Sequence, residues 1–129
     1  MEDIQADLQA RAASGDIGVD AILIMPDDLS QSPAGWPLIG RFSQKHKLAV
    51  SGGAAYEAET GGVFSHIPDY AESGKLAAAL ADKILRGTPA GNLPVATPVE
   101  TLLLNYKRAQ ELGLTVPEEL FNLATEIIR

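Results

Sequence analysis

The stretch VDAILIM, residues 19–25, decides which class of fold this chain can adopt. Apart from Asp20 every residue in it is apolar, and a run of this length and type suits a strand that is buried on both faces. Strands of that kind belong to parallel sheets, whose two faces are covered by helices. The polar segment PDDLSQS, residues 26–32, then forms a loop. The run therefore predicts a central strand of a mainly parallel sheet.

Helical patterns flank this strand on both sides. Before it, apolar residues recur every four positions, at Ile4, Leu8 and Ala12. This spacing predicts an amphipathic helix over residues 2–14, which Gly15 ends. After it, Ser32 next to Pro33 is a typical helix start, and we expect that helix to end near residues 45–47. The strand thus lies between two helices, as in layered α/β folds.

Three more short apolar segments predict further strands: LAVS (residues 48–51), VFSH (63–66) and TLLLN (101–105). The glycine-flanked segment GGAAYEAETGG, residues 52–62, predicts a loop between the first two. Strands that alternate with helices favour an α/β fold. We expect a three-layer, Rossmann-like lobe with a mainly parallel sheet.

The clearest helix signal begins at Asp69. Together with Glu72 it has the spacing of a capping box, in which both side chains satisfy free backbone N–H groups. An apolar stripe follows at Leu76, Leu80 and Ile84. Alanines between these positions allow close approach, so we expect this helix to pack on the sheet. Gly87 after Arg86 fits a helix C-terminus.

The chain then changes character. Prolines at positions 89, 94 and 98 exclude a helix or a central strand and predict an extended passage. Asn105 is placed to cap a short helix that Gly113 closes. Thr115 and Glu118 repeat the capping-box spacing, which predicts a last helix to about residue 128.

Composition excludes several classes of protein. A length of 129 residues, 46% of them hydrophobic, suits one domain with a real core. The net charge of −7 disfavours nucleic acid as a partner. The absence of cysteine excludes disulfides and thiol catalysis. The acidic N-terminal segment MEDIQADLQA does not fit a signal peptide, and no apolar run is long enough to span a bilayer.

Polar residues gather where the predicted strands end. In parallel sheets, ligands bind outside the carboxyl ends of the strands. The candidate ligand-binding residues at this edge are Asp28, Ser30, Gly52, Gly53, Ser65, His66 and Asp69. Because the carboxyl ends of neighbouring parallel strands meet, we expect these residues to lie along one edge of the sheet.

The chemistry of this edge leaves several interpretations open. Asp27 and Asp28 could hold a metal ion, act as acid or base, bind a ligand amine, or simply solvate and cap the loop. The glycine pairs match neither G-x-G-x-x-G nor the P-loop spacing, and no G-x-S-x-G surrounds any serine. Trp36, Tyr56 and Tyr70 could stack on a ligand or pack within the fold. We therefore expect no catalytic residues, metal or cofactor.

Several spaced motifs near the C-terminus resemble those of one protein family. KILRGTPAGNLPV (residues 83–95) contains I-L-R-G and L-P-V, and residues 105–117 read N-x-x-x-A-x-x-L-G-x-x-V-P. In combination these motifs resemble the substrate-binding proteins of bacterial ABC transporters, of the tryptophan/tyrosine-binding type. Upstream, GGVFSHIPDY (residues 61–70) is similar to the family's G-G-x-x-S-Y-G-x-D segment. VDAILIMPDDLSQS is similar to its strand and polar cleft loop.

The resemblance implies two α/β lobes joined by crossing segments, with a small-molecule ligand in the cleft between them. This chain resembles the second lobe: a ligand-binding lobe over residues 1–88, a hinge-like segment over 89–105 and a helical tail over 106–129. The implied partners are a small molecule (an amino acid is one class), the missing N-terminal lobe and an ABC permease. An isolated lobe would also be prone to self-association.

The resemblance also implies a periplasmic or extracytoplasmic location, with a membrane anchor on the full-length protein. The alternative is a ligand-sensing domain of a signalling or regulatory protein with the same fold. Ser65 and Asp69 match the family's Ser and Asp, while Asp28 and Ser30 lie in its first cleft loop. Three positions depart from the pattern: His66 and Ile67, where the family has Tyr and Gly, and Ala49, where Pro is common.

Overall fold

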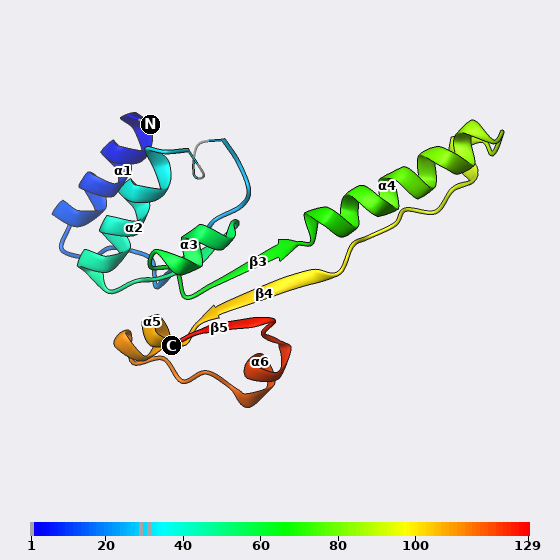
Figure 1. Cartoon of the computed structure of the whole chain (residues 1–129). Coiled ribbons are helices and arrows are strands. Elements are labelled where there is room, and N and C mark those ends of the chain that lie inside the picture. The colour runs from blue at the N-terminus through cyan, green and yellow to red at the C-terminus, as the bar shows by residue number, and fades with distance from the viewer. Residues whose placement is uncertain (1, 29, 31) are drawn as a thin grey trace.

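A five-stranded sheet organises the chain in the computed structural model, which describes residues 2–28, 30 and 32–129 (Figure 1). The strands are β1 (Ala21–Leu23), β2 (Ala49–Gly52), β3 (Phe64–Pro68), β4 (Glu100–Asn105) and β5 (Glu126–Ile128), in that spatial order. The pairs β1–β2, β2–β3 and β4–β5 are parallel, and β3–β4 is antiparallel. The predicted mainly parallel α/β fold is therefore confirmed.

The position of β1 differs from the prediction. This strand lies at the end of the sheet, and within the described residues no strand pairs with its outer edge. Ile22 and Ile24 face the core, whereas Leu23 is 70% exposed and Met25 is also exposed. The expectation of a central strand buried on both faces was wrong. An apolar run shows that both faces can be buried, but only the neighbouring elements decide whether they are.

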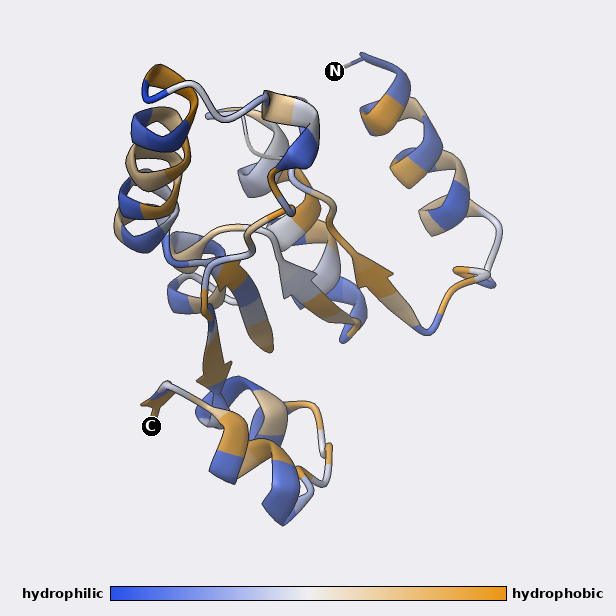
Figure 2. Cartoon of the chain, turned by 90° about the vertical axis from the view of Figure 1, so that its right-hand side faces the viewer, coloured by the Kyte–Doolittle hydropathy of each residue, from blue (hydrophilic) through white to orange (hydrophobic). Residues whose placement is uncertain are grey.

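The core lies between the sheet and two helices on one of its faces, α1 (Glu2–Ala13) and α2 (Gly35–His46). Its buried centre consists of Ile24, Trp36, Ile39 and Val50, against which Ile4, Leu8 and Ile22 pack. In Figure 2, hydrophilic and hydrophobic stretches alternate along α1, although none of its residues is fully buried. Both predicted helices are thus confirmed. Pro37 is tolerated because it lies in the first turn of α2, where backbone N–H groups have no intrahelical acceptor.

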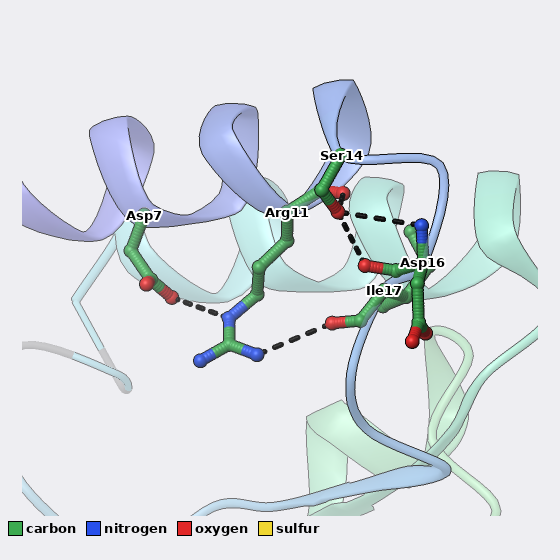
Figure 3. Close-up of polar contacts among 5 residues, drawn as sticks. All are labelled: Asp7, Arg11, Ser14, Asp16 and Ile17. Atoms are coloured by element: carbon green, nitrogen blue, oxygen red, sulfur yellow. Dashed lines mark hydrogen bonds and ion pairs between the residues drawn. The ribbon is translucent and has the colours of Figure 1, made fainter.

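A small polar network fixes the path from α1 to β1 (Figure 3). Arg11 Nε donates to Asp7 Oδ2 at 2.8 Å, one helical turn earlier. Arg11 Nη1 also donates to the carbonyl of Ile17, at 3.2 Å. Ser14 Oγ donates to the carbonyl of Asp16. The end of the helix is therefore tied to the turn that leads into β1.

The α4 helix (Tyr70–Leu85) begins and ends at the predicted residues, but only the Asp69 half of the predicted capping box forms, since the N–H of Asp69 donates to the carbonyl of Val99, and the helix does not pack as predicted. Asp69 Oδ1 accepts the N–H of Glu72 at 2.9 Å, and Gly87 follows the helix with φ +100°. All of α4 is described, and none of its residues is buried. Leu85 is 87% exposed, and Ile84 is exposed as well. The expectation that an apolar stripe packs this helix on the sheet was therefore wrong.

The reason is visible in the topology. The antiparallel strands β3 and β4 carry α4 away from the rest of the molecule, and the chain returns through the 3₁₀ turn η1 (Ala90–Asn92) and an extended stretch (Figure 1). Leu76 and Leu80 are only half-buried, as are Leu93 and Pro98 of the returning segment. An apolar stripe indicates that a helix can pack against another element, but it does not identify that element.

In the C-terminal part, the first predicted helix is present, but the second is shorter than predicted. The helix α5 (Tyr106–Glu111) is capped by Asn105 Oδ1, which accepts the N–H of Arg108 at 2.9 Å. The helix α6 (Glu118–Leu123) is short, and β5 follows it, so the predicted helix to residue 128 was wrong. The free edge of β4 offers backbone partners to the last residues: Thr125 N donates to the carbonyl of Leu102 at 2.8 Å. No helix among the described residues is both long and apolar enough to cross a bilayer.

Candidate functional site

The carboxyl ends of three parallel strands form one edge of the sheet. Leu23 of β1 is level with Ser51 of β2, and Gly52 is level with Ser65 of β3. The loops after β1 and β2 therefore emerge side by side, and β3 continues past them towards α4. The predicted site residues come from these loops and from β3 with its continuation. Their role as ligand contacts remains a prediction.

The loop after β2 is held by a carboxylate that the sequence analysis missed. Glu57 lies in α3 (Ala55–Glu59), a short helix inside the segment predicted to be a loop. It is 0% exposed, and its Oε2 accepts the backbone N–H groups of Gly53 (2.5 Å) and Ala54 (2.9 Å). Glu57 is three residues after Ala54, the N-cap of α3, and a Glu at this position commonly accepts the N–H of the N-cap residue. This spacing was the signal in the sequence that could have identified Glu57. Glu57 thereby fixes the backbone at the carboxyl end of β2.

Two of the predicted residues, Gly52 and Ser65, pack against this loop and hold it in place. Ser65 is fully buried, and its Oγ donates to the carbonyl of Ala54 at 2.7 Å. A Cβ on Gly52 would lie 2.3 Å from Ser65 Oγ and 2.9 Å from Glu57 Oε2. Gly52 is therefore required by close packing. Gly52 and Ser65 therefore position the loop. They place the backbone of Gly53 and Ala54 at the carboxyl edge of the sheet.

The loop after β1 is also internally bonded. Ser30 is buried; its N–H donates to Asp27 Oδ1 at 2.8 Å, and its Oγ lies 2.8 Å from Asp27 Oδ2 and 3.0 Å from the carbonyl of Met25. Asp27 thus acts as a loop cap, one of the interpretations left open by the sequence. The side chain of Asp28 is exposed beside it. No three potential metal ligands gather anywhere in the described part of the chain.

The other two predicted residues are His66, within β3, and Asp69, which follows that strand. His66 Nε2 is 3.0 Å from Glu100 Oε2 on the neighbouring strand β4, and both side chains are largely exposed. An exposed pair of this kind contributes little stability. Asp69 caps α4. The predicted set therefore divides into two loops at the edge and a third group on the connection to α4.

The aromatic residues near this edge behave differently from one another. Trp36 is buried, and its Nε1 donates to Thr60 Oγ1 at 2.7 Å. Tyr56 packs edge-on against it with ring centroids 6.5 Å apart, and it is 39% exposed. Burial first, and then the charge of Glu57 and a hydrogen bond to it, raise the pKa of Tyr56 above its ordinary value of 10.0. Tyr70 at the start of α4 is exposed.

Three solved structures share this architecture. The ABC domain of Streptococcus pneumoniae in complex with L-Trp is 26% identical; the match covers 98% of this chain and 42% of that one, with a TM-score of 0.72. A conserved domain protein from Vibrio cholerae is 28% identical; the match covers 95% of this chain and 41% of that one, with a TM-score of 0.67. A ligand-free, open substrate-binding protein with adhesive properties from Clostridium difficile is 22% identical (95% and 40%, TM-score 0.62) and shows the fold alone.

The chain spans about two fifths of the length of these structures. No sequence among curated proteins matches it. The model of one family, described as ABC transporter substrate binding protein, matches residues 3–128 and therefore nearly the whole chain. The motifs in residues 83–95 and 105–117 and the mainly parallel α/β lobe agree with that match. The chain belongs to the ABC transporter substrate-binding protein family.

Proposed function

We propose that this chain is one ligand-binding lobe of a two-lobed protein that holds a small molecule between its lobes and presents it to an ABC permease. Family membership supports solute binding, and the relative from Streptococcus pneumoniae was solved with L-Trp bound. An amino acid is therefore the first ligand class to test. In this proposal Asp28 and the backbone of Gly53 face the ligand, while Ser30, Gly52 and Ser65 hold their loops in place.

The observation that carries the two-lobed arrangement is the exposed apolar face of α4. Tyr70, Gly74, Ala77, Ala81 and Leu85 are spaced so that they share one face of the helix. Tyr70 is 70% exposed and Leu85 still more so. A helix with such a face gains stability only by packing against another element. We propose that α4 packs on the other lobe.

The connection between the lobes follows from this assignment. β3 leads from the sheet to α4 and β4 leads back from it, so in this proposal each serves as a crossing segment. The proposed hinge then consists of residues 89–105 together with β3. His66 lies in the β3 part of this hinge. A paired, antiparallel connection restricts bending to few positions, as hinged binding proteins require.

The outer face of the sheet supports the same view. Leu23 and Met25 leave apolar surface uncovered at the unpaired edge of β1, and Phe64 of β3 is exposed as well. Exposed apolar surface and an open strand edge both favour association. We propose that the rest of a longer protein covers this face, and that the chain by itself self-associates. Members of this family act outside the cytoplasm, and we propose the same location, with a membrane anchor on the full-length protein.

Binding by the chain alone tests the half-site. One lobe offers one wall of a site that normally buries most of the ligand surface. Losing half of a micromolar binding energy of roughly 8 kcal/mol leaves roughly millimolar affinity. We expect calorimetry with L-Trp, L-Tyr and pools of other amino acids to show no micromolar binding. Micromolar binding to a monomer would show that the site is complete in these residues and would contradict the two-lobed proposal.

Amide spectra locate the weak binding. At millimolar amino acid, the amide signals of Asp27, Asp28, Gly53 and Ala54 should shift, because these residues form the proposed wall. Signals of Lys83 and Arg86, at the far end of α4, serve as the internal control. If every pool leaves the wall unshifted, solute binding at this edge is wrong. Permease and ATPase genes beside the reading frame would support transport, whereas a kinase in the same frame would support the sensing alternative.

A further inference from the structure

A groove of about 530 Å³ runs along the flank of α2, between that helix and α3. Prolines 33 and 37, Trp36 and Tyr56 supply most of its apolar wall, and Arg41 lies at its rim. None of the seven predicted ligand-binding residues lines it. α2 follows the loop after β1 and ends before β2, so the groove extends from the carboxyl edge along the side of the lobe. One end of the groove therefore lies near the proposed cleft, but the residues that line the two are different.

The aromatic wall of the groove is rigid. The indole N–H of Trp36 is bonded to Thr60 Oγ1 at 2.7 Å, and the ring of Tyr56 stands at 87° to the indole ring. The polar atom of the indole is therefore satisfied within the protein, and its ring offers only apolar surface to the groove. A preformed apolar wall of this kind binds a ligand without the cost of ordering side chains.

Gly40 is an independent indication that the groove is kept open. It lies in the interior of α2, where glycine destabilises a helix relative to alanine. Its backbone does not have the positive φ that favours glycine. A Cβ at this position would lie 3.6 Å from the ring of Trp36, which is an ordinary contact. Neither backbone conformation nor packing therefore requires glycine, and its effect is to keep free the part of the groove that a side chain on α2 would fill.

Arg41 gives the groove its charge preference. Its side chain is exposed, and it forms no ion pair with any other described residue. A guanidinium without a partner beside an apolar groove is complementary to a carboxylate attached to an apolar body. The volume lies in the range of small-molecule sites.

We propose that this groove is a second ligand site, outside the interlobe cleft, for a small molecule with an apolar ring and a carboxylate. The ring lies mainly against Tyr56 and the two prolines, above Gly40, and the carboxylate pairs with Arg41. The residues that line this site belong to α2, to α3 or to the segments directly beside them, so the site is formed within this chain.

Trp36 reports directly on the groove, because it is the single tryptophan of the chain. We expect 3-phenylpropionate to change its emission in a saturable way, with a Kd on the order of millimolar for so small a ligand. The neutral 3-phenylpropionamide should bind about two- to fivefold more weakly, the range of an exposed ion pair. A linear, non-saturating response, or equal affinity for the acid and the amide, would overturn the proposal.

Matched variants assign the site to these residues. Gly40→Leu fills the groove and should weaken binding at least about tenfold, whereas Gly74→Leu, at a helix position with no atom within 4 Å, should leave it unchanged. Arg41→Gln should reduce affinity for the acid to that for the amide. Lys45→Gln removes a charge from the same helix and should have no such effect. Full affinity in a folded Gly40→Leu or Arg41→Gln protein would refute the assignment.

A measurement on the unaltered chain keeps the test independent of folding effects. The indole N–H signal of Trp36 and the amide signal of Gly40 should shift with 3-phenylpropionate, while those of Asp28 and Gly53 should not. Shifts confined to Asp28 and Gly53 would place the ligand in the proposed cleft and overturn the second site.

Discussion

Gly52→Ala tests whether the loop after β2 is held by close packing. The new Cβ would lie 2.3 Å from Ser65 Oγ, 2.7 Å from Glu57 Cβ and 2.9 Å from Glu57 Oε2. Relief requires Ser65 to move, which leaves the carbonyl of Ala54 without its hydrogen bond. Overpacking and one lost buried hydrogen bond together predict a loss of about 2–4 kcal/mol in the free energy of unfolding.

Urea unfolding followed by Trp36 emission measures this loss, because Trp36 is buried in the core. The control is Gly74→Ala, the same substitution at a position with no atom within 4 Å, which should not lower the midpoint. A loss of 2–4 kcal/mol is large against the total of about 6–19 kcal/mol expected for a domain of this size.

A double-mutant cycle identifies the clash. Ser65→Ala alone should cost about 1 kcal/mol for its hydrogen bond to Ala54. Combined with Gly52→Ala it removes the shortest contact, so the pair should cost at least about 1 kcal/mol less than the sum of the single changes. Rescue should be incomplete, because the contact with Glu57 Cβ remains. Additive costs, or a Gly52→Ala protein within about 0.5 kcal/mol of the parent, would refute the packing argument.

Two further predictions concern Tyr56 and Asp69. Folding raises the pKa of Tyr56, so above pH 10.0 the unfolded chain loses a proton that the folded chain retains, and stability falls as pH rises. Tyr56→Phe should show a smaller fall in urea midpoint than the parent protein between about pH 8 and pH 11. An equal fall in the two proteins would show that Tyr56 is not the cause. Asp69→Ala removes the cap of α4 and should lower helicity in circular dichroism by weakening that helix by about 1 kcal/mol. Because α4 has no buried residue, the urea midpoint reported by Trp36 should stay constant, and a parallel drop would show that α4 is coupled to the core.

Local signals in the sequence determined the elements that depend on neighbours along the chain. Asp69 and Asn105 cap helices as predicted, since a cap needs only a side chain and N–H groups two or three residues later. Gly87 ends α4 because it tolerates a positive φ. The alternation of apolar runs with helical periodicity likewise predicted the α/β class. The motifs in residues 83–95 and 105–117 predicted the family, because they combine several such local features at fixed spacing.

The tertiary structure alone decided where these elements lie. Apolar runs at β1 and α4 look alike whether or not a partner covers them, so the sequence predicted a central strand and a packed helix where the structure has an edge strand and an exposed helix. The last residues form β5 and not helix because the edge of β4 offers long-range hydrogen bonds that local propensity does not record.

The same distinction applies to the site. The sequence placed Asp28, Ser30, Gly52, Gly53 and Ser65 near strand ends, because side chains that follow parallel strands meet at one edge. It did not reveal Glu57, which acts by folding back onto the N–H groups of a loop that was predicted to lack a helix. Nor did it separate residues that face the edge from those that support it. That separation depends on burial and on hydrogen bonds between segments, which exist only once the chain has folded.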